Sequence, residues 1–223
     1  KAIDAAKHPA LFMVDTIASL VNTEYHMDEW GVDVVIAASQ KGLMMPPGMS
    51  FTAANKRATD LSRDVVMPRE YWSWASRLDM ESYRRFCGTA PEHLMFGLRE
   101  SIDMIFEEGM NAVFARHARN AQAVREAVAV WCSDGPMEFN AIIPEQRSNS
   151  ITCIRTPEDA FADDIRATAR STFNVSMGGG LAALAGRAFR IGHMGDLNDP
   201  MVMGALGGIE ATLQLLGVPH GKG

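Results

Sequence analysis

The chain has 223 residues, of which 47% are hydrophobic and 22% charged, and its formal net charge is −6. These values are typical of a globular protein with one large or two modest domains, and they exclude a disordered chain. The acidic balance argues against nucleic acid as the main partner, because phosphate binding needs a basic surface. No apolar run reaches the length of a membrane span and no signal peptide opens the chain, so we expect a soluble cytoplasmic protein without a membrane partner.

The three cysteines, Cys87, Cys132 and Cys153, are odd in number, widely spaced and not arranged as CxxC. This pattern indicates reduced thiols, and it does not match a disulfide framework or a zinc site. The six histidines also lack the spacing of metal ligands. We therefore expect no metal site.

The first ten residues, KAIDAAKHPA, have a helical pattern with no initiator methionine or capping residue ahead of them. This indicates that an N-terminal part of the natural protein is absent. Two apolar runs follow, LFMVD at 11–15 and VDVVIAAS at 32–39, each with the length and composition of a buried parallel strand. After the turn residues Pro46, Pro47 and Gly48, MSFTAA at 49–54 is typical of a further strand.

Each of the two apolar runs is followed by a charged residue, Asp15 after the first and Lys41 after the second. In open α/β sheets, ligands bind just beyond the carboxyl ends of the strands. An acid and an amine at that edge suit pyridoxal phosphate: Lys41 would form the Schiff base, and Asp15 would face the pyridinium nitrogen. Either residue alone is more often a solvated strand end or a turn residue.

The rest of the chain divides into an aromatic-rich, irregular segment at 60–88, two long helices and a region of short strands and helices. The helices are expected at 93–109 and 111–131, and we place a domain boundary near Gly109, which gives domains of 1–108 and 109–223. Strands are expected at 138–144, 148–157 and 187–194. Helices are expected at 160–174 and 198–217, the latter capped by Asn198 or Asp199, and Gly178–Gly180 is interpreted as a flexible turn.

Several motifs, taken in order, resemble the class V aminotransferases of pyridoxal-phosphate fold type I. They are VDTIASL, MDEWGVDVVIAASQKGLMMPPGMSF, GLRESIDMIFEEG and FRIGHMGDLND, and the similarity runs from about residue 9 to residue 218. Within the class, the chain most resembles the serine–glyoxylate and alanine–glyoxylate aminotransferases. The resemblance implies an α/β fold: a partial large domain with a mostly parallel sheet, plus a C-terminal α+β domain. The family's N-terminal segment has no counterpart here.

The resemblance also implies roles for single residues. Lys41 matches the catalytic Schiff-base lysine, and Asp15 matches the acid bonded to the ring nitrogen of the cofactor. Ile17 falls where the family packs a branched side chain on the ring. Gln40 matches a residue that hydrogen-bonds the cofactor phosphate. Thr89 matches a threonine that reaches the phosphate of the cofactor in the neighbouring subunit. Arg190 matches the arginine that binds the substrate α-carboxylate.

The implied activity is transfer of an amino group from a small amino acid, serine, alanine or aspartate, to glyoxylate or a similar 2-oxo acid. The implied assembly is a homodimer with active sites at the subunit interface. Two alternatives stay open. One is a cysteine desulfurase or another lyase of the same class, for which Cys87 is the only loop candidate to accept sulfur. The other is a non-catalytic truncated homologue.

Overall fold

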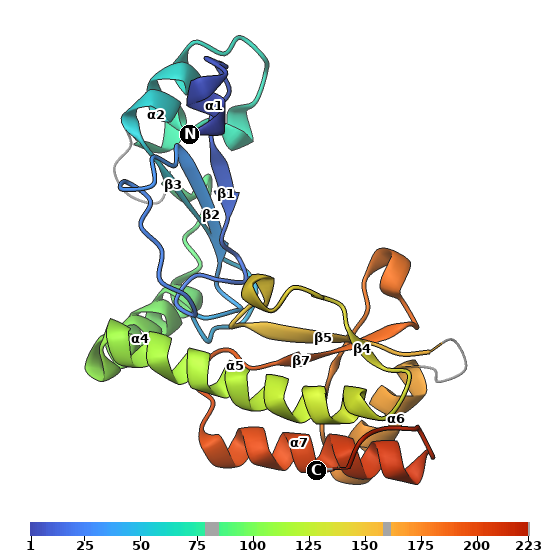
Figure 1. The fold of residues 1–223 in the computed structure, drawn as a ribbon. Helices are drawn as coiled ribbons and strands as arrows, with labels where there is room; N and C mark the ends of the chain where they lie inside the picture. Colours follow the sequence, from blue (N-terminus) through green and yellow to red (C-terminus); the bar gives the residue numbers. More distant parts are fainter. Residues whose placement is uncertain (79–84, 158–161, 223) are drawn as a thin grey trace. The chain divides into compact units, whose positions relative to one another are not determined.

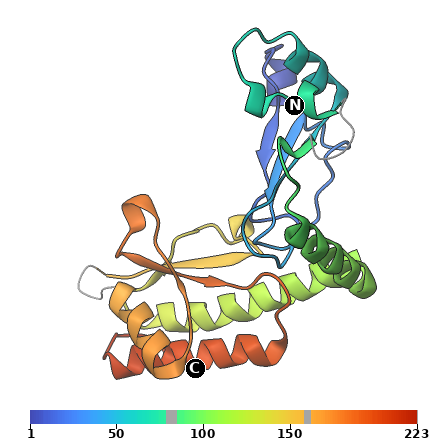
Figure 2. The same ribbon diagram turned by 180° about the vertical axis from the view of Figure 1, so that it is seen from behind.

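The computed structural model describes residues 1–78, 85–157 and 162–222. The chain divides into two compact units, the first made of residues 1–20 and 24–107 and the second of residues 21–23 and 108–223. Figures 1 and 2 show their helices and strands from opposite sides. Each unit is built around its own sheet.

The first unit contains a three-stranded sheet in the order β1-β2-β3. Strand β1 (Met13–Asp15) runs parallel to β2 (Val34–Ala38), and β3 (Ser50–Ala54) runs antiparallel to β2. The central position of β2 explains its apolar sequence, VVIAA, because a strand between two neighbours buries side chains on both faces. The three predicted strands are thus confirmed, and they form one parallel and one antiparallel pair.

The helices of the first unit are mostly short. The helix predicted over the first ten residues is confined to α1 (Ala2–Ala5). Helix α2 (Lys56–Arg63) directly follows β3, and the side chain of Asn55 caps it by accepting the N–H of Ala58. The remaining helices are η1 (Glu70–Trp72), α3 (Ala75–Leu78) and the long α4 (Glu92–Glu108).

Asp33 ties together the amino ends of β1, β2 and α2. Its buried carboxylate accepts the N–H of Phe12 at 2.8 Å, the side-chain amide of Asn55 at 2.8 Å and Nη1 of Arg57 at 3.0 Å. These hydrogen bonds, the one from Phe12 first, hold the pKa of Asp33 below its usual value, together with the positive charge of Arg57. A charged group is stable in this buried position because all three donors converge on it.

The second unit is an antiparallel sheet with helices on one face, which is the arrangement of an α+β domain (Figure 1). Its strands, in the order of the sheet, are β4 (Glu138–Phe139), β5 (Ile151–Arg155), β7 (Ala188–Gly192) and β6 (Gly178–Gly179). Its helices are α5 (Met110–Ser133), α6 (Ala162–Phe173) and α7 (Asp199–Leu215). Helix α5 begins after Gly109, whose φ of +86° ends α4 as predicted.

Alternation along the strands of this sheet decides which side chains enter the core. Ile154 and Phe189 are cross-strand partners with no exposed surface, and they pack with Trp131 in one apolar cluster that includes all three helices. Their neighbours Cys153 and Arg190 are also cross-strand partners. Because successive side chains of a strand point to opposite faces, Cys153 and Arg190 lie on the face away from the helices.

Details of the second unit refine the sequence prediction. The strand expected at 138–144 ends at Phe139, and Pro144 starts the short helix η3 (Pro144–Gln146) instead. The helix expected at 160–174 is α6, and its first two predicted residues lie outside the described residues. The flexible turn expected at Gly178–Gly180 is wrong, because Gly178 and Gly179 form strand β6, paired with β7. Asn198 caps α7 as expected.

Two buried histidines of the second unit are held in their neutral form. His193 lies between the carbonyl of Asn149, 3.0 Å from Nδ1, and the hydroxyl of Thr152, 2.9 Å from Nε2. Burial lowers the pKa of His193 to about 4. His117 accepts the N–H of Gly195 at Nε2, and burial lowers its pKa as well. Both side chains support the packing of this unit.

We expect Asp33→Asn to lower the free energy of unfolding by about 1–3 kcal/mol, because a neutral amide presents an N–H group to donors that need an acceptor. Chemical denaturation at neutral pH, followed by tryptophan fluorescence, measures this change. Asp60→Asn is the matched control: the Asp60–Lys56 ion pair is exposed, so its loss should cost well under about 1 kcal/mol. Equal effects of the two substitutions would contradict the role of Asp33.

We expect His193 to make the protein less stable as the pH falls from about 6.5 to about 4. In this window the unfolded chain binds a proton at His193 that the folded chain does not, so the free energy of unfolding falls, by at most about 3 kcal/mol. His193→Gln should flatten this pH dependence, measured as denaturation midpoints across the window. His26→Gln, at an exposed position, should leave it unchanged. Identical pH profiles for wild type and His193→Gln would refute this assignment.

Candidate active site at the sheet edge

The acid and the amine predicted to act together emerge from neighbouring parallel strands. Asp15 is the last residue of β1 and pairs with Ile36 of β2, while Lys41 follows the end of β2 by three residues. Parallel strands end at the same edge of a sheet, so both residues lie at the carboxyl edge of the first unit's sheet. The Asp15 carboxylate is exposed, and one of its oxygens accepts the N–H of Ile17 at 2.8 Å.

The chain after β1 is pinned to β2. Thr16 is fully buried, and both its N–H and its hydroxyl donate to the carbonyl of Ile36, at 2.8 and 3.0 Å. These two hydrogen bonds to one carbonyl oxygen fix the backbone directly beside Asp15. Ile17, half-buried, follows at the start of a turn. The position of the carboxylate is therefore set by a neighbour whose side chain makes no contact with solvent.

The loop that carries Lys41 closes on a single buried serine. Ser39 donates its hydroxyl to the carbonyl of Pro46 at 2.8 Å, and its backbone exchanges hydrogen bonds with Met45 and Met49. Inside this closed loop the N–H of Met44 donates to the carbonyl of Lys41 at 2.9 Å. Lys41 itself is half-buried on this tightly bonded loop.

Helix α4 holds the same loop from another direction. The hydroxyl of Ser101 donates to the carbonyl of Leu43 at 2.5 Å, and both residues are buried. Met45 is also buried, and a Cβ on Gly97 of α4 would lie 3.7 Å from its methyl carbon. The loop that carries Lys41 is therefore held by hydrogen bonds and by buried, uncharged side chains.

The other predicted site residues occupy separate places. Gln40 is exposed and directly precedes Lys41, so it shares the sheet edge. Thr89 is exposed in the connection that leads into α4, and among the described residues no hydrogen bond joins it to the Lys41 loop. Arg190 belongs to the second unit, whereas Asp15 and Lys41 belong to the first.

Arg190 projects from β7 between two partners in the sheet, Cys153 on β5 and Gly178 on β6. Its Nε donates to the carbonyl of Gly179 at 2.6 Å. None of the ion pairs formed by the described residues includes Arg190, although it is half-buried. A half-buried guanidinium without a carboxylate partner is suited to binding a carboxylate from a ligand.

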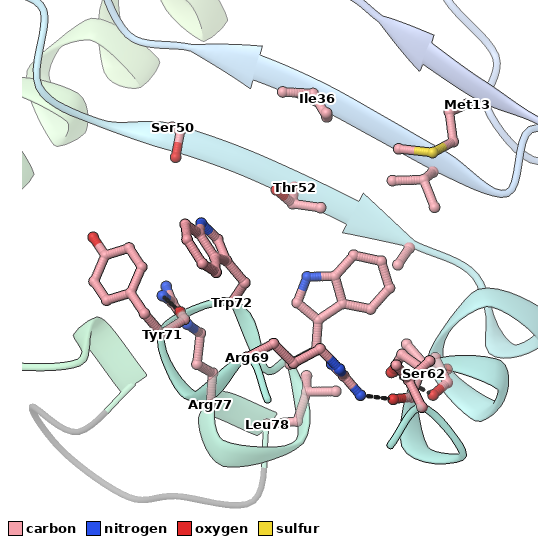
Figure 3. A pocket seen from close by; sticks show the side chains of 15 residues that line it. Met13, Ile36, Ser50, Thr52, Ser62, Arg69, Tyr71, Trp72, Arg77 and Leu78 are labelled. Atoms are coloured by element: carbon pink, nitrogen blue, oxygen red, sulfur yellow. Dashed lines mark hydrogen bonds between the residues drawn. The ribbon is translucent and has the colours of Figure 1, made fainter. Parts of the chain in front are cut away.

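A cavity of about 870 Å³ lies over one face of the first unit's sheet (Figure 3). Tyr71, Trp72 and Arg69 face Ser50 and Thr52 of β3 across it. Asp15 belongs to the same sheet face, because its strand partner Ile36 lines the cavity, but neither Asp15 nor Lys41 lines it. The aromatic cluster that the sequence placed in an irregular segment thus forms a wall of this cavity.

Sequence reasoning missed the hydroxyl groups that position the site. Thr16, Ser39 and Ser101 are buried, and each hydroxyl donates to a backbone carbonyl. The only signal for Ser39 was a small polar residue at the end of an apolar run, directly before Gln40 and Lys41. Among the described residues no cluster of three or more histidine, cysteine, aspartate or glutamate side chains is arranged to hold a metal.

The site's residues fit the cofactor that the sequence suggested. An exposed carboxylate and a half-buried amine share one sheet edge, and these are the two group types that a pyridine ring carrying an aldehyde requires. One oxygen of the carboxylate accepts a backbone N–H, which restricts its orientation.

Comparisons with known proteins agree with this geometry. The family described as Aminotransferase class-V matches residues 2–190. The L-aspartate–glyoxylate aminotransferase of Paracoccus denitrificans is 37% identical over 219 residues, which cover 98% of this chain and 54% of that protein. The serine–glyoxylate aminotransferase of Methylorubrum extorquens is 39% identical over 218 residues, which cover 96% of this chain and 53% of that protein.

Comparison with solved structures leads to the same family. The crystal structure of ureidoglycine–glyoxylate aminotransferase from Bacillus subtilis aligns with a TM-score of 0.83 and 28% sequence identity, covering 96% of this chain and 56% of that one. This chain therefore spans about half the length of the relatives it matches. Because the family pattern and the identities extend over nearly all of the chain, it belongs to the class V aminotransferases, which are pyridoxal-phosphate enzymes of fold type I.

Proposed function

We propose that this chain forms the cofactor-lysine part of an aminotransferase that moves an amino group from a small amino acid to glyoxylate. The amino donor would be serine, alanine or aspartate, and a similar 2-oxo acid could replace glyoxylate. The single observation that carries the proposal is the emergence of Asp15 and Lys41 at one edge of a parallel strand pair. The names of the relatives, aspartate–glyoxylate and serine–glyoxylate aminotransferase, support the substrate class.

We assign residues 1–108 to the later part of the cofactor-binding large domain and residues 109–223 to the C-terminal small domain. The sheet edge with Lys41 supports the first assignment, and the antiparallel sheet with helices on one face supports the second. Family membership implies pyridoxal 5′-phosphate, which when bound supplies a protonated ring that accepts electron density from the amino acid's Cα.

In this proposal the residues at the sheet edge divide the work. Asp15, an exposed carboxylate, would lie against the ring nitrogen and keep its proton in place. Lys41 would hold the cofactor through Nζ and then use the freed amine to take the proton from Cα of the amino acid and deliver it to the cofactor carbon. Its loop, held by the hydrogen bonds of Ser39 and Ser101, would keep Nζ within reach of both carbons.

The remaining residues would bind and orient the cofactor and the substrate. Ile17, beside Asp15, would pack on the face of the ring, and Gln40 would donate its side-chain amide to the cofactor phosphate. Arg190 would hold the substrate's α-carboxylate in its fork, which sets the direction of the Cα–H bond as well as the affinity.

We further propose a homodimer in which Thr89 reaches the phosphate bound by the neighbouring subunit. The exposed position of Thr89 is compatible with a contact outside its own subunit. We propose a cytoplasmic location and no nucleic-acid or membrane partner, in line with the net charge of −6. No helix among the described residues is long and apolar enough to cross a membrane.

Adding pyridoxal phosphate to the chain and reducing with borohydride should attach the cofactor permanently to Lys41. Mass spectrometry of the digested protein would locate the added mass, and loss of the visible absorption band would accompany reduction. Lys41→Ala should abolish the specific label. Lys56→Ala, which removes an exposed lysine paired with Asp60, should retain it. Labelling of another lysine, or none, would refute the assignment and favour the non-catalytic alternative.

The same preparation distinguishes the transaminase from the cysteine desulfurase alternative. Cys87 is exposed and free, as a sulfur acceptor must be. Incubation with cysteine should leave Cys87 without a persulfide, whereas incubation with serine, alanine or aspartate should convert the bound cofactor to its amine form. A persulfide on Cys87 would overturn the transaminase proposal.

A further inference from the structure

The Arg190 side chain lies beside Gly178, in space that a side chain at position 178 would occupy; we call this space the Gly178 slot. Gly178 of β6 is its cross-strand partner, and a Cβ built on Gly178 would lie 3.3 Å from Nε, 3.4 Å from Nη2 and 3.4 Å from Cβ of Arg190. The distance to Nε is slightly tighter than ordinary van der Waals contact, and the other two lie at its lower limit. A side chain at position 178 would therefore press on Arg190, and glycine leaves this space to the arginine side chain.

The next residue fixes how the guanidinium is turned. Nε of Arg190 donates to the carbonyl of Gly179 at 2.6 Å. The guanidinium is planar, so fixing its Nε–H also fixes the direction in which the two terminal nitrogens point. Those nitrogens are the pair that grips a carboxylate through two parallel hydrogen bonds.

Each of the three consecutive glycines has a different neighbour. A Cβ on Gly179 would lie 2.8 Å from Nη1 of Arg166, on the opposite face of the sheet from Arg190. A Cβ on Gly180 would lie 1.8 Å from the carbonyl oxygen of Leu184, which is backbone and cannot move aside cheaply. Of the three glycines, Gly178 is therefore the one whose Cβ would meet the Arg190 side chain, and Gly179 contacts Arg190 through its carbonyl oxygen.

We propose that Gly178, with the carbonyl of Gly179, is a positioning residue that sets the orientation of Arg190 for carboxylate binding. This inference rests on the proposed role of Arg190 in binding the substrate carboxylate. The energetic reason is preorganisation: a long arginine side chain has many rotamers, and a slot that already selects one reduces the cost of ordering it when the ligand binds. Cys153 on β5 is the cross-strand partner of Arg190 on the other side.

The test is nuclear magnetic resonance of the arginine Nε–H groups in the full 223-residue chain. Arg190→Lys removes the Arg190 signal and so identifies it. We expect Gly178→Ala to shift this signal and to speed its exchange with water, because the guanidinium must move by a few tenths of an ångström. The Nε–H of Arg166, which donates to the carbonyl of Met177 at 3.1 Å, serves as an internal marker of the folded sheet.

The reciprocal variant sharpens the test. Gly179→Ala keeps the carbonyl that Arg190 uses, but it places a Cβ against Arg166, so the Arg166 signal should shift most. If Gly178→Ala leaves the Arg190 signal and its exchange unchanged while the Arg166 marker is intact, the positioning role is overturned. Loss of both signals in Gly178→Ala would also overturn it, because the residue would then act on the whole sheet.

Glyoxylate titration connects the slot to function. In the wild-type chain glyoxylate should shift the Arg190 signal, and Gly178→Ala should weaken this binding by up to about tenfold, because a misplacement of about 1 Å can cost about a hundredfold and the displacement here is a few tenths of an ångström. Gly207→Ala in α7 is the matched control, since its Cβ would meet no atom within 4 Å. Equal affinities in wild type and Gly178→Ala would refute the inference.

The proposed function and the positioning role fail in different ways. A wild-type Arg190 signal that does not respond to glyoxylate would overturn the carboxylate role of Arg190 itself, and with it the positioning role of Gly178. A wild-type signal that responds, together with an undisturbed Gly178→Ala variant, would overturn only the role of Gly178.

Discussion

The parallel pairing of β1 with β2 is the constraint on which the candidate site depends. Because the two strands run in the same direction, their last residues lie at one edge of the sheet, and Asp15 and the loop that carries Lys41 emerge at that edge. An antiparallel pairing would place the acid and the amine at opposite ends of the sheet. A shift of register by one residue would turn Asp15 to the other face. The two hydrogen bonds from Thr16 to the carbonyl of Ile36 oppose such a shift.

The groups proposed to react are exposed or half-buried, whereas the groups that position them are buried and uncharged. Ser39 and Ser101 fix the Lys41 loop through hydroxyl-to-carbonyl bonds, which satisfy otherwise unpaired backbone groups without placing a charge in the interior. The one buried charge of this sheet, Asp33, lies at the far end of β2 from Lys41. The strong electrostatic interaction that holds the sheet together is thus kept away from the residues proposed to act on the cofactor.

The strands could be predicted from the sequence, and the residues proposed to react could be nominated from it, because both depend on local patterns. An apolar run of five residues that ends in a charge is visible without knowing its neighbours, and so are Asp15, Lys41 and the strand that carries Arg190. The supporting residues depend on partners distant in the chain. Nothing near Ser101 indicates that its hydroxyl reaches Leu43, which lies 58 positions earlier.

The glycine run at Gly178–Gly180 shows most clearly that local sequence patterns do not reveal contacts with distant residues. The run at Gly178–Gly180 has low strand propensity, so local reasoning favours a flexible turn. In the structure Gly178 and Gly179 form a strand, and a Cβ on each would crowd the side chains of Arg190 and Arg166 respectively. A Cβ on Gly180, just after the strand, would clash with the backbone of Leu184. The reason for each glycine lies in the atoms that surround it, and the sequence alone does not reveal those atoms.

The register of Cys153 with Arg190 has a practical consequence. A fluorophore or spin label on this thiol would sit beside the guanidinium and would sense whether an anion occupies it. Burial raises the pKa of Cys153, which disfavours the reactive thiolate, and the other two free cysteines, the exposed Cys87 and the half-buried Cys132, would have to be replaced by serine first. The protein thus carries a natural attachment point for an optical or magnetic reporter of ligand binding.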